Sequence, residues 1–91
     1  MIQEEVKQRF EKALKEDGKK VWAGVNQTMR KVDNDAAEII LIAEDVTPVE
    51  LIRPLEIAAK ERGIDHYYAT KEEIAKIVGC PRPASAACLT K

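Results

Sequence analysis

The chain has 91 residues, of which 45% are hydrophobic and 34% charged, and its formal net charge at pH 7 is −1. This length suits one compact domain, so we expect residues 1–91 to form a single domain. No apolar run reaches the roughly 18 residues that a membrane span needs, so we expect no membrane partner. The charged, amphipathic start, MIQEEVKQRF, lacks the apolar core of a signal peptide, which indicates the cytoplasm.

Charge is unevenly distributed along the chain. Residues 17–34 carry four bases against two acids, hence +2, whereas residues 35–79 carry five bases against ten acids, hence −5. One interpretation is a locally basic face on an acidic body. The other is ordinary solvated surface charge, and the charge pattern alone does not separate the two.

The first half of the chain predicts two helices and two strands. Residues 2–16 predict a helix that Gly18 ends, because apolar side chains recur at every fourth position: Ile2, Val6, Phe10 and Leu14. Residues 19–23 predict a short strand. Residues 25–34 predict a helix with a buried stripe formed by Val25, Met29 and Val32. Residues 38–43, EIILIA, are almost continuously apolar and predict a central strand covered on both faces.

The second half continues the same alternation. TPVE at residues 47–50 predicts a capping box with proline at the first helical position, and Pro54 interrupts the helix that runs on to Gly63. Residues 64–70 predict a third, internal strand, and Thr70 is expected to cap a helix over residues 71–78. A stiff CPRP loop leads to a last strand over residues 84–91. The order α-β-α-β-α-β-α-β predicts an α/β fold, a three-layer α/β/α sandwich with a four-stranded mixed or mostly parallel sheet.

The sequence offers little enzymatic chemistry. There is no G-x-G-x-x-G turn and no Walker-type GK[ST]. His66 lies mid-strand and is better interpreted as structural than as a general base, and Glu44 and Asp45 lack a third metal ligand by spacing. Cys80 and Cys88 have no metal-type or redox-type spacing and predict a loop thiol and a buried thiol. We therefore expect no enzyme, no metal and no cofactor.

The stretch GVNQTMRK, residues 24–31, predicts a binding surface. The free N–H groups at a helix start attract phosphates, and Asn26 and Gln27 each carry a donor pair and an acceptor that suit base edges. Arg30 lies four residues after Asn26 on the same face, and Gly24 permits close approach of a backbone. The alternative is that Asn26 only caps the helix while Gln27 and Arg30 are solvated. Residue chemistry alone favours neither the binding surface nor this alternative.

GVNQTMRK, followed by IILIAEDVTPVELIRPLEIAAKERGI and GCPRPASAACL, resembles the kink-turn RNA-binding ribosomal protein family. This is the L-seven-Ae type, with its spliceosomal, small-nucleolar and short bacterial relatives. The resemblance covers residues 18–90 through G-x-N-[EQ]-x-x-[KR], I-A-x-D-x-x-P, a proline-broken helix and a G-x-x-R-P loop. It implies a non-enzymatic protein that stabilises tandem sheared G·A pairs beside a bulge within a ribonucleoprotein, as a monomer when free.

The resemblance also implies the residues of the RNA site. Asn26 and Gln27 would contact guanine edges, and Arg30 would support that contact. The loop of Cys80, Pro81 and Arg82 would pack on the bulge nucleotide. The full expected set is Gly24, Asn26, Gln27, Arg30, Lys20, Lys31, Thr47, Leu51, Lys71, Cys80, Pro81 and Arg82.

The chain departs from the family pattern at two points. Gln27 stands where glutamate is usual, and a neutral amide makes weaker hydrogen bonds than a carboxylate. Trp22 and Ala23 stand where many relatives have lysines; Trp22 is expected to pack against a helix rather than stack on a nucleotide. Two other functions stay open: a purine-rich internal-loop binder of the ribosomal L-thirty type, and a protein-interaction or scaffold domain with a decayed RNA site. Other ribonucleoprotein subunits are further candidate partners.

Overall fold

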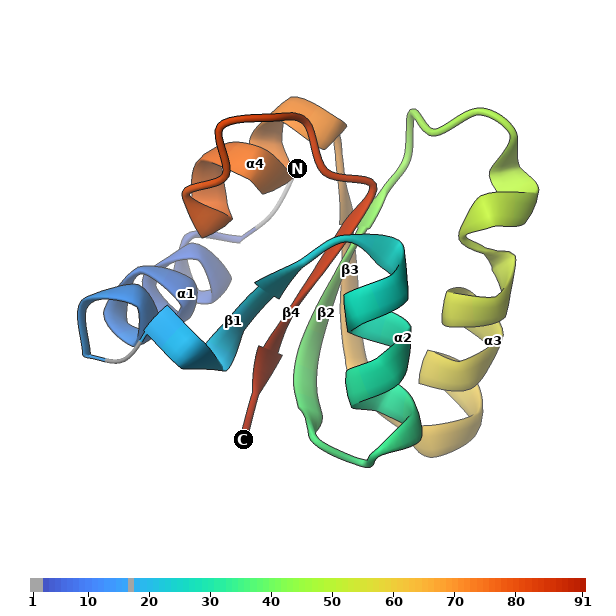
Figure 1. The fold of residues 1–91 in the computed structure, drawn as a ribbon, viewed down its shortest axis with the longest axis horizontal. Helices are drawn as coiled ribbons and strands as arrows, with labels where there is room; N and C mark the ends of the chain where they lie inside the picture. Colours follow the sequence, from blue (N-terminus) through green and yellow to red (C-terminus); the bar gives the residue numbers. More distant parts are fainter. Residues whose placement is uncertain (1–2, 17) are drawn as a thin grey trace.

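The computed structural model describes residues 3–16 and 18–91 (Figure 1). Four helices alternate with four strands, as the sequence predicts. In chain order they are α1 (Glu4–Glu16), β1 (Val21–Ala23), α2 (Val25–Asp33), β2 (Ala37–Ala43), α3 (Arg53–Arg62), β3 (Asp65–Ala69), α4 (Lys71–Val78) and β4 (Ala86–Thr90), with 3₁₀ turns at Gly18–Lys20 and Val49–Leu51.

The sheet is mixed, with the strand order β1-β4-β2-β3. The pairings β1/β4 and β4/β2 are antiparallel, and only β2/β3 is parallel. The mixed sheet is therefore confirmed and the mostly parallel alternative is wrong, because β4 returns between β1 and β2. For the same reason β3 lies at an edge of the sheet, so its prediction as an internal strand is also wrong.

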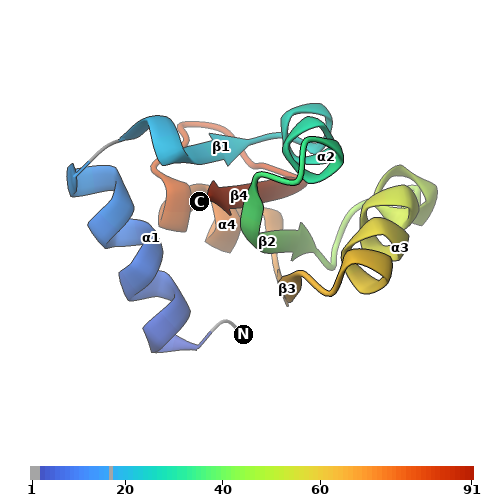
Figure 2. The ribbon, with the colours of Figure 1, turned by 90° about the horizontal axis from the view of Figure 1, so that it is seen from below.

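Helices cover both faces of this sheet, which confirms the three-layer sandwich. The helices α2 and α3 pack on one face, and α1 and α4 on the other (Figure 2). Strand β2 lies between them, and residues 39–43 are all fully buried or 1% exposed. Successive side chains of a strand point to opposite faces, so a strand with a helix layer on each side is apolar at every position. Among the described residues, no helix combines the length and apolarity that crossing a bilayer requires.

Helix α1 buries the stripe expected from its sequence. Val6 and Phe10 are buried, and Leu14 is half-buried beside the buried Ala13. Ile2 lies outside the described residues. The first strand begins at Val21 rather than at residue 19, because residues 18–20 form a 3₁₀ turn.

The capping box predicted at residues 47–50 is wrong. No side chain caps the short 3₁₀ turn Val49–Leu51, and α3 starts only at Arg53, with Pro54 in its first turn. Proline has no N–H and fits the first turn of a helix, where that group has no partner within the helix. Pro54 therefore starts a new helix instead of bending one that began earlier. Gly63, at φ 66°, ends α3 as expected.

Thr70 caps α4 as predicted, since its Oγ1 accepts a hydrogen bond of 3.1 Å from the backbone N–H of Glu73. Thr70→Ala should lower the free energy of unfolding by about 1 kcal/mol, because it leaves that N–H without its acceptor. Chemical denaturation followed by circular dichroism measures the change. Thr47→Ala is the matched control: Thr47 is exposed and caps no helix, so its removal should change stability little. Equal losses from both variants would contradict the role of Thr70.

Candidate functional site

Several loops and helix ends meet at one end of the sheet, where β1 and β2 finish and β4 begins (Figure 1). Backbone hydrogen bonds hold them together. The N–H of Gly24 donates to the carbonyl of Ala86 at 2.7 Å, and the N–H of Ala43 donates to the carbonyl of Ser85 at 2.9 Å. The start of α2 is therefore tied to the start of β4, next to the end of β2.

Further hydrogen bonds bring α4 and two loops to the same end. Asp45 Oδ1 accepts from the backbone N–H of Lys71 at 2.9 Å, and the carbonyl of Lys71 accepts from the N–H of Ala84 at 3.4 Å. The loops 44–48 and 79–85 therefore both contact the first residue of α4. In this way segments far apart in the sequence form one continuous surface beside α2.

The first turn of α2 is open to solvent. Its N-cap is Gly24, at φ 106° and ψ 145°, and no side chain caps the helix. Asn26 and Gln27 in that turn are exposed, and so is Arg30 one turn further on. The interpretation of Asn26 as a mere helix cap is therefore wrong. The uncapped N–H groups carry partial positive charge, so this end of α2 can accept an anion beside two amide side chains.

Asn26 and Arg30 also line a shallow hollow along α2. Its other lining residues are Met29, Asp33 and Asn34. These residues follow the i, i+3, i+4, i+7 and i+8 spacing of one helix face. The predicted neighbourhood of Asn26 and Arg30 is therefore present in the structure. We call Asn26, Gln27 and Arg30 the amide surface.

The inner face of α2 contains a residue that the sequence did not single out. Thr28 is fully buried with Val32, whereas the expected stripe members Val25 and Met29 are only half-buried. Thr28 lies three residues after Val25 and four before Val32. This spacing is that of a buried helix position, but the polar hydroxyl of threonine argued against burial.

Three more predicted residues lie on the segment between β2 and α3 and at the start of α4. Thr47 is exposed, Leu51 is 53% exposed, and Lys71 is half-buried. Val49, which the sequence did not single out, is 46% exposed. Two large apolar side chains of the 3₁₀ turn before α3 therefore face solvent.

The loop that follows α4 carries the remaining expected contacts. Cys80 is half-buried, and Pro81 and Arg82 are exposed. The loop starts where the N–H of Cys80 donates to the carbonyl of Ala75 and ends next to Lys71. It therefore runs back along α4 toward the sheet end that carries the amide surface (Figure 1).

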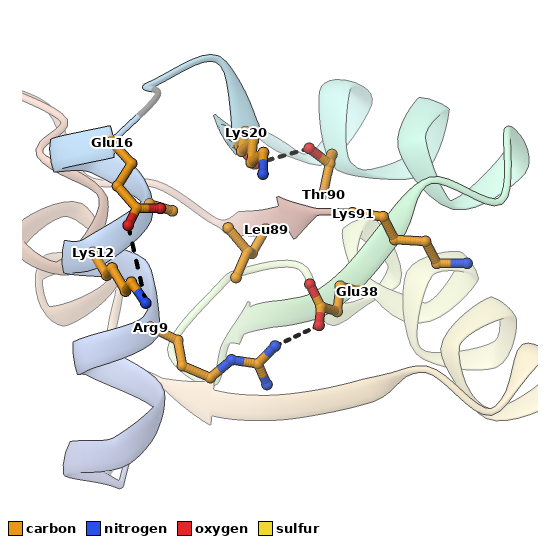
Figure 3. A pocket seen from close by; sticks show the side chains of 9 residues that line it. Arg9, Lys12, Glu16, Lys20, Glu38, Leu89, Thr90 and Lys91 are labelled. Carbon is orange, nitrogen blue, oxygen red and sulfur yellow. Dashed lines mark hydrogen bonds and ion pairs between the residues drawn. The ribbon is translucent and has the colours of Figure 1, made fainter.

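The two predicted lysines are placed differently. Lys20 is the last residue of the 3₁₀ turn that precedes β1, at the opposite end of that strand from Gly24. It lines a pocket between α1 and the sheet, where Arg9 pairs with Glu38 and Lys12 lies 3.9 Å from Glu16 (Figure 3). The structure therefore does not bring Lys20 together with the amide surface.

Lys31 contacts a ring. Its Nζ lies 4.1 Å from the centroid of Trp22, and both side chains are half-buried. Trp22 itself packs against the core, in agreement with the expectation that it packs rather than stacks on a nucleotide. The two residues are nine apart across a turn, so no local pattern in the sequence shows their contact.

The candidate acidic and histidine residues have structural partners. Asp45 caps the start of α4, and His66 Nδ1 lies 3.1 Å from the carbonyl of Ile64. Within residues 3–16 and 18–91, no group of three or more His, Cys, Asp or Glu side chains is placed to hold a metal ion.

Comparison with known proteins places the chain in a family. The family model described as "Ribosomal protein L7Ae/L30e/S12e/Gadd45 family" matches residues 4–91. The chain belongs to this family. It is 33% identical over 89 residues to the large ribosomal subunit protein eL8 of Methanobrevibacter smithii. The aligned region covers 94% of this chain and 72% of that protein.

A solved structure shares the fold. The Giardia lamblia 15.5kD RNA binding protein superposes with a TM-score of 0.77 at 22% identity, over 100% of this chain and 78% of the other. At that identity the likeness concerns the fold alone. The shared fold agrees with the three-layer arrangement and mixed sheet that the sequence of this family member predicts.

Gly24→Ala should lower the free energy of unfolding by about 1–3 kcal/mol. A side chain at φ 106° is strained, although an added Cβ would meet no atom within 4 Å. Urea denaturation measures the cost. Asn34→Ala, at the other end of α2 with φ −85°, should change stability much less. A Gly24→Ala variant as stable as the parent would contradict the strained start of α2.

The two cysteines should differ in reactivity toward iodoacetamide. Burial raises the pKa of the Cys88 thiol to about 11, although the nearby Thr28 hydroxyl and Lys31 charge act in the opposite direction. At pH 8 Cys88 therefore stays protonated and covered, while the half-buried Cys80 is accessible. Mass spectrometry should find one label in the folded protein and two after unfolding. Labelling of Cys88 at the rate of Cys80 in the folded chain would contradict this.

Proposed function

We propose that this chain is a non-enzymatic RNA-binding protein that recognises and stabilises a kink-turn within a ribonucleoprotein. The observation that carries the proposal is the exposure of Asn26 and Gln27 at the uncapped start of α2. Membership of the L7Ae/L30e/S12e/Gadd45 family supports it, as do a relative named as a ribosomal subunit protein and a structural neighbour named as an RNA-binding protein.

The chemistry of the amide surface suits mispaired purines. Each amide offers two N–H donors and one acceptor oxygen. Sheared G·A pairs expose base edges that a regular A-form helix hides in its deep, narrow groove. Asn26 and Gln27 would bond to the guanine edges. Arg30 would reach the adjacent backbone or stack on a base, and the free N–H groups of α2 would face a phosphate.

The rest of the same sheet end would hold the bulge. Leu51 and the loop of Cys80, Pro81 and Arg82 would cover an unpaired nucleotide, whose base has an apolar face. Thr47 and Lys71 would flank it. Gly24 would let the RNA approach the backbone, because no side chain projects there. Lys20 would act only on RNA that extends along β1, since it lies at the far end of that strand.

The proposal extends to the state of the protein in the cell. We propose a cytoplasmic protein that is monomeric when free, works without cofactor or metal, and assembles with RNA and other ribonucleoprotein subunits. The ribosomal relative supports the association with a ribonucleoprotein. Size-exclusion chromatography with light scattering would test the oligomeric state.

Binding of a kink-turn duplex tests the function. The parent should bind it more tightly than a matched duplex in which Watson–Crick pairs replace the tandem G·A pairs. Asn26→Ala and Arg30→Ala should each weaken binding by about 1–3 kcal/mol. The measurement is a fluorescence-anisotropy titration at several salt concentrations, because phosphate contacts make the affinity salt-dependent.

The controls use the same residue types elsewhere on the chain. Gln8→Ala removes an exposed amide from α1, on the other face of the sheet, and Arg62→Ala removes an exposed guanidinium from the end of α3. Both should bind like the parent. If the parent binds neither duplex at low salt, the scaffold-domain alternative replaces RNA binding. If it prefers a purine-rich internal loop, the L-thirty-type function replaces kink-turn recognition.

A further inference from the structure

Trp22 and Lys31 form a contact across the turn that joins β1 to α2. The Lys31 Nζ lies 4.1 Å from the centroid of the indole, well within the reach of a cation–π interaction. Both side chains are half-buried, and the Trp22 side chain packs against the core. The Lys31 ammonium is therefore held at one place, although lysine side chains are flexible.

This contact lies beside the amide surface. Lys31 follows Gln27 by four residues, so the two side chains lie on the same side of α2, one turn apart. Trp22 comes two residues before Gly24, on β1. Among the residues that the structure describes, β1 pairs with β4 alone, so no described strand covers its other edge. Gln27, Lys31 and Trp22 thus form a row next to the row of Asn26 and Arg30.

We propose that Trp22 positions the ammonium of Lys31, a residue already in the expected RNA set, so that it neutralises one phosphate of the strand flanking the bases read by Asn26 and Gln27. This inference rests on the proposed function. The ammonium has three N–H donors and no acceptor. Its attraction to the ring face leaves donors free to bond a phosphate oxygen.

The structure favours positioning by Trp22 over stacking on a nucleotide. The ammonium of Lys31 covers a face of the indole that a base would need. A lysine that the ring already orders loses less rotamer freedom when it binds a phosphate. Trp22 therefore acts through Lys31, and the charge of Lys31 acts on the RNA.

Salt dependence of RNA binding tests the charge of Lys31. Lys31→Met keeps the length of the side chain and removes its charge. The slope of log K against log salt for the kink-turn duplex should become shallower by about 1, the effect of one lost phosphate contact. Lys60→Met removes the same charge from the exposed face of α3 and should leave the slope unchanged.

Variants of Trp22 test whether its ring positions the Lys31 ammonium. Trp22→Leu keeps an apolar side chain but removes the ring. It should weaken binding about two- to fivefold, the fold-change at the lower end of the range for a cation–π contact. The slope should stay near that of the parent, because the Lys31 charge is still present. Trp22→Phe retains a ring and should restore part of the loss. Trp22→Leu combined with Lys31→Met should bind like Lys31→Met alone.

The free protein gives an independent readout. Trp22 is the only tryptophan of the chain, so its fluorescence reports its own surroundings. Lys31→Met should change the emission in the absence of RNA, and Lys60→Met should not. An unchanged emission would overturn the contact.

The remaining outcomes separate this inference from the proposed function. If Asn26→Ala loses binding but Lys31→Met keeps the parental slope, the Lys31 contact is wrong and kink-turn recognition stands. If the losses of binding free energy from Trp22→Leu and Lys31→Met add up in the double variant, Trp22 does not act through Lys31. A parent that binds no kinked RNA removes both proposals. Thermal melting checks that each variant folds, and Trp22→Phe carries the test if Trp22→Leu does not.

Discussion

The antiparallel insertion of β4 between β1 and β2 is the constraint on which the structure depends. Cys88 pairs with Trp22 on one side and with Ile40 on the other. The inserted strand is fully buried at Ala86, Ala87 and Cys88. Because these side chains are small, α2 packs closely over β4. The carbonyl of Ala86 also holds the N–H of Gly24, so the strand that completes the sheet also fixes the start of the candidate site.

The two ends of the sheet have different chemistry. At one end, Asn26 and Gln27 lie in the first turn of α2, which no side chain caps. Exposed apolar side chains such as Leu51 belong to the same end. At the other end, Arg9 and Glu38 form an ion pair that joins α1 to β2 (Figure 3). Under the proposed function, a chain of net charge −1 recognises RNA mainly through amides and backbone N–H groups. Such contacts favour one RNA shape over a general attraction to phosphate, which is what charge alone provides.

The sequence predicted the elements and the exposure of the residues proposed for the site, because both depend on local patterns. The apolar run of β2, the cap at Thr70 and the exposure of Asn26 all follow from residues close together in the chain. The place of β4 and the edge position of β3 did not follow, because strand order depends on contacts between distant segments. The capping box failed at Thr47 because Pro54 starts α3 later. The Trp22–Lys31 contact was missed because a turn separates its two residues, and Thr28 was missed because its hydroxyl hid a core position.

The long separation between Gly24 and Ala86 has a consequence for how the protein is made. A nascent chain that has reached only α4 already contains α2 and the amides, but it lacks the strand that separates β1 from β2. Both strands then have unpaired edges, and the N–H of Gly24 lacks its acceptor. Closing so long a loop delays folding. The amide surface therefore takes its final form only after synthesis has passed β4. Under the proposed function, an incomplete chain would not yet bind RNA through this surface.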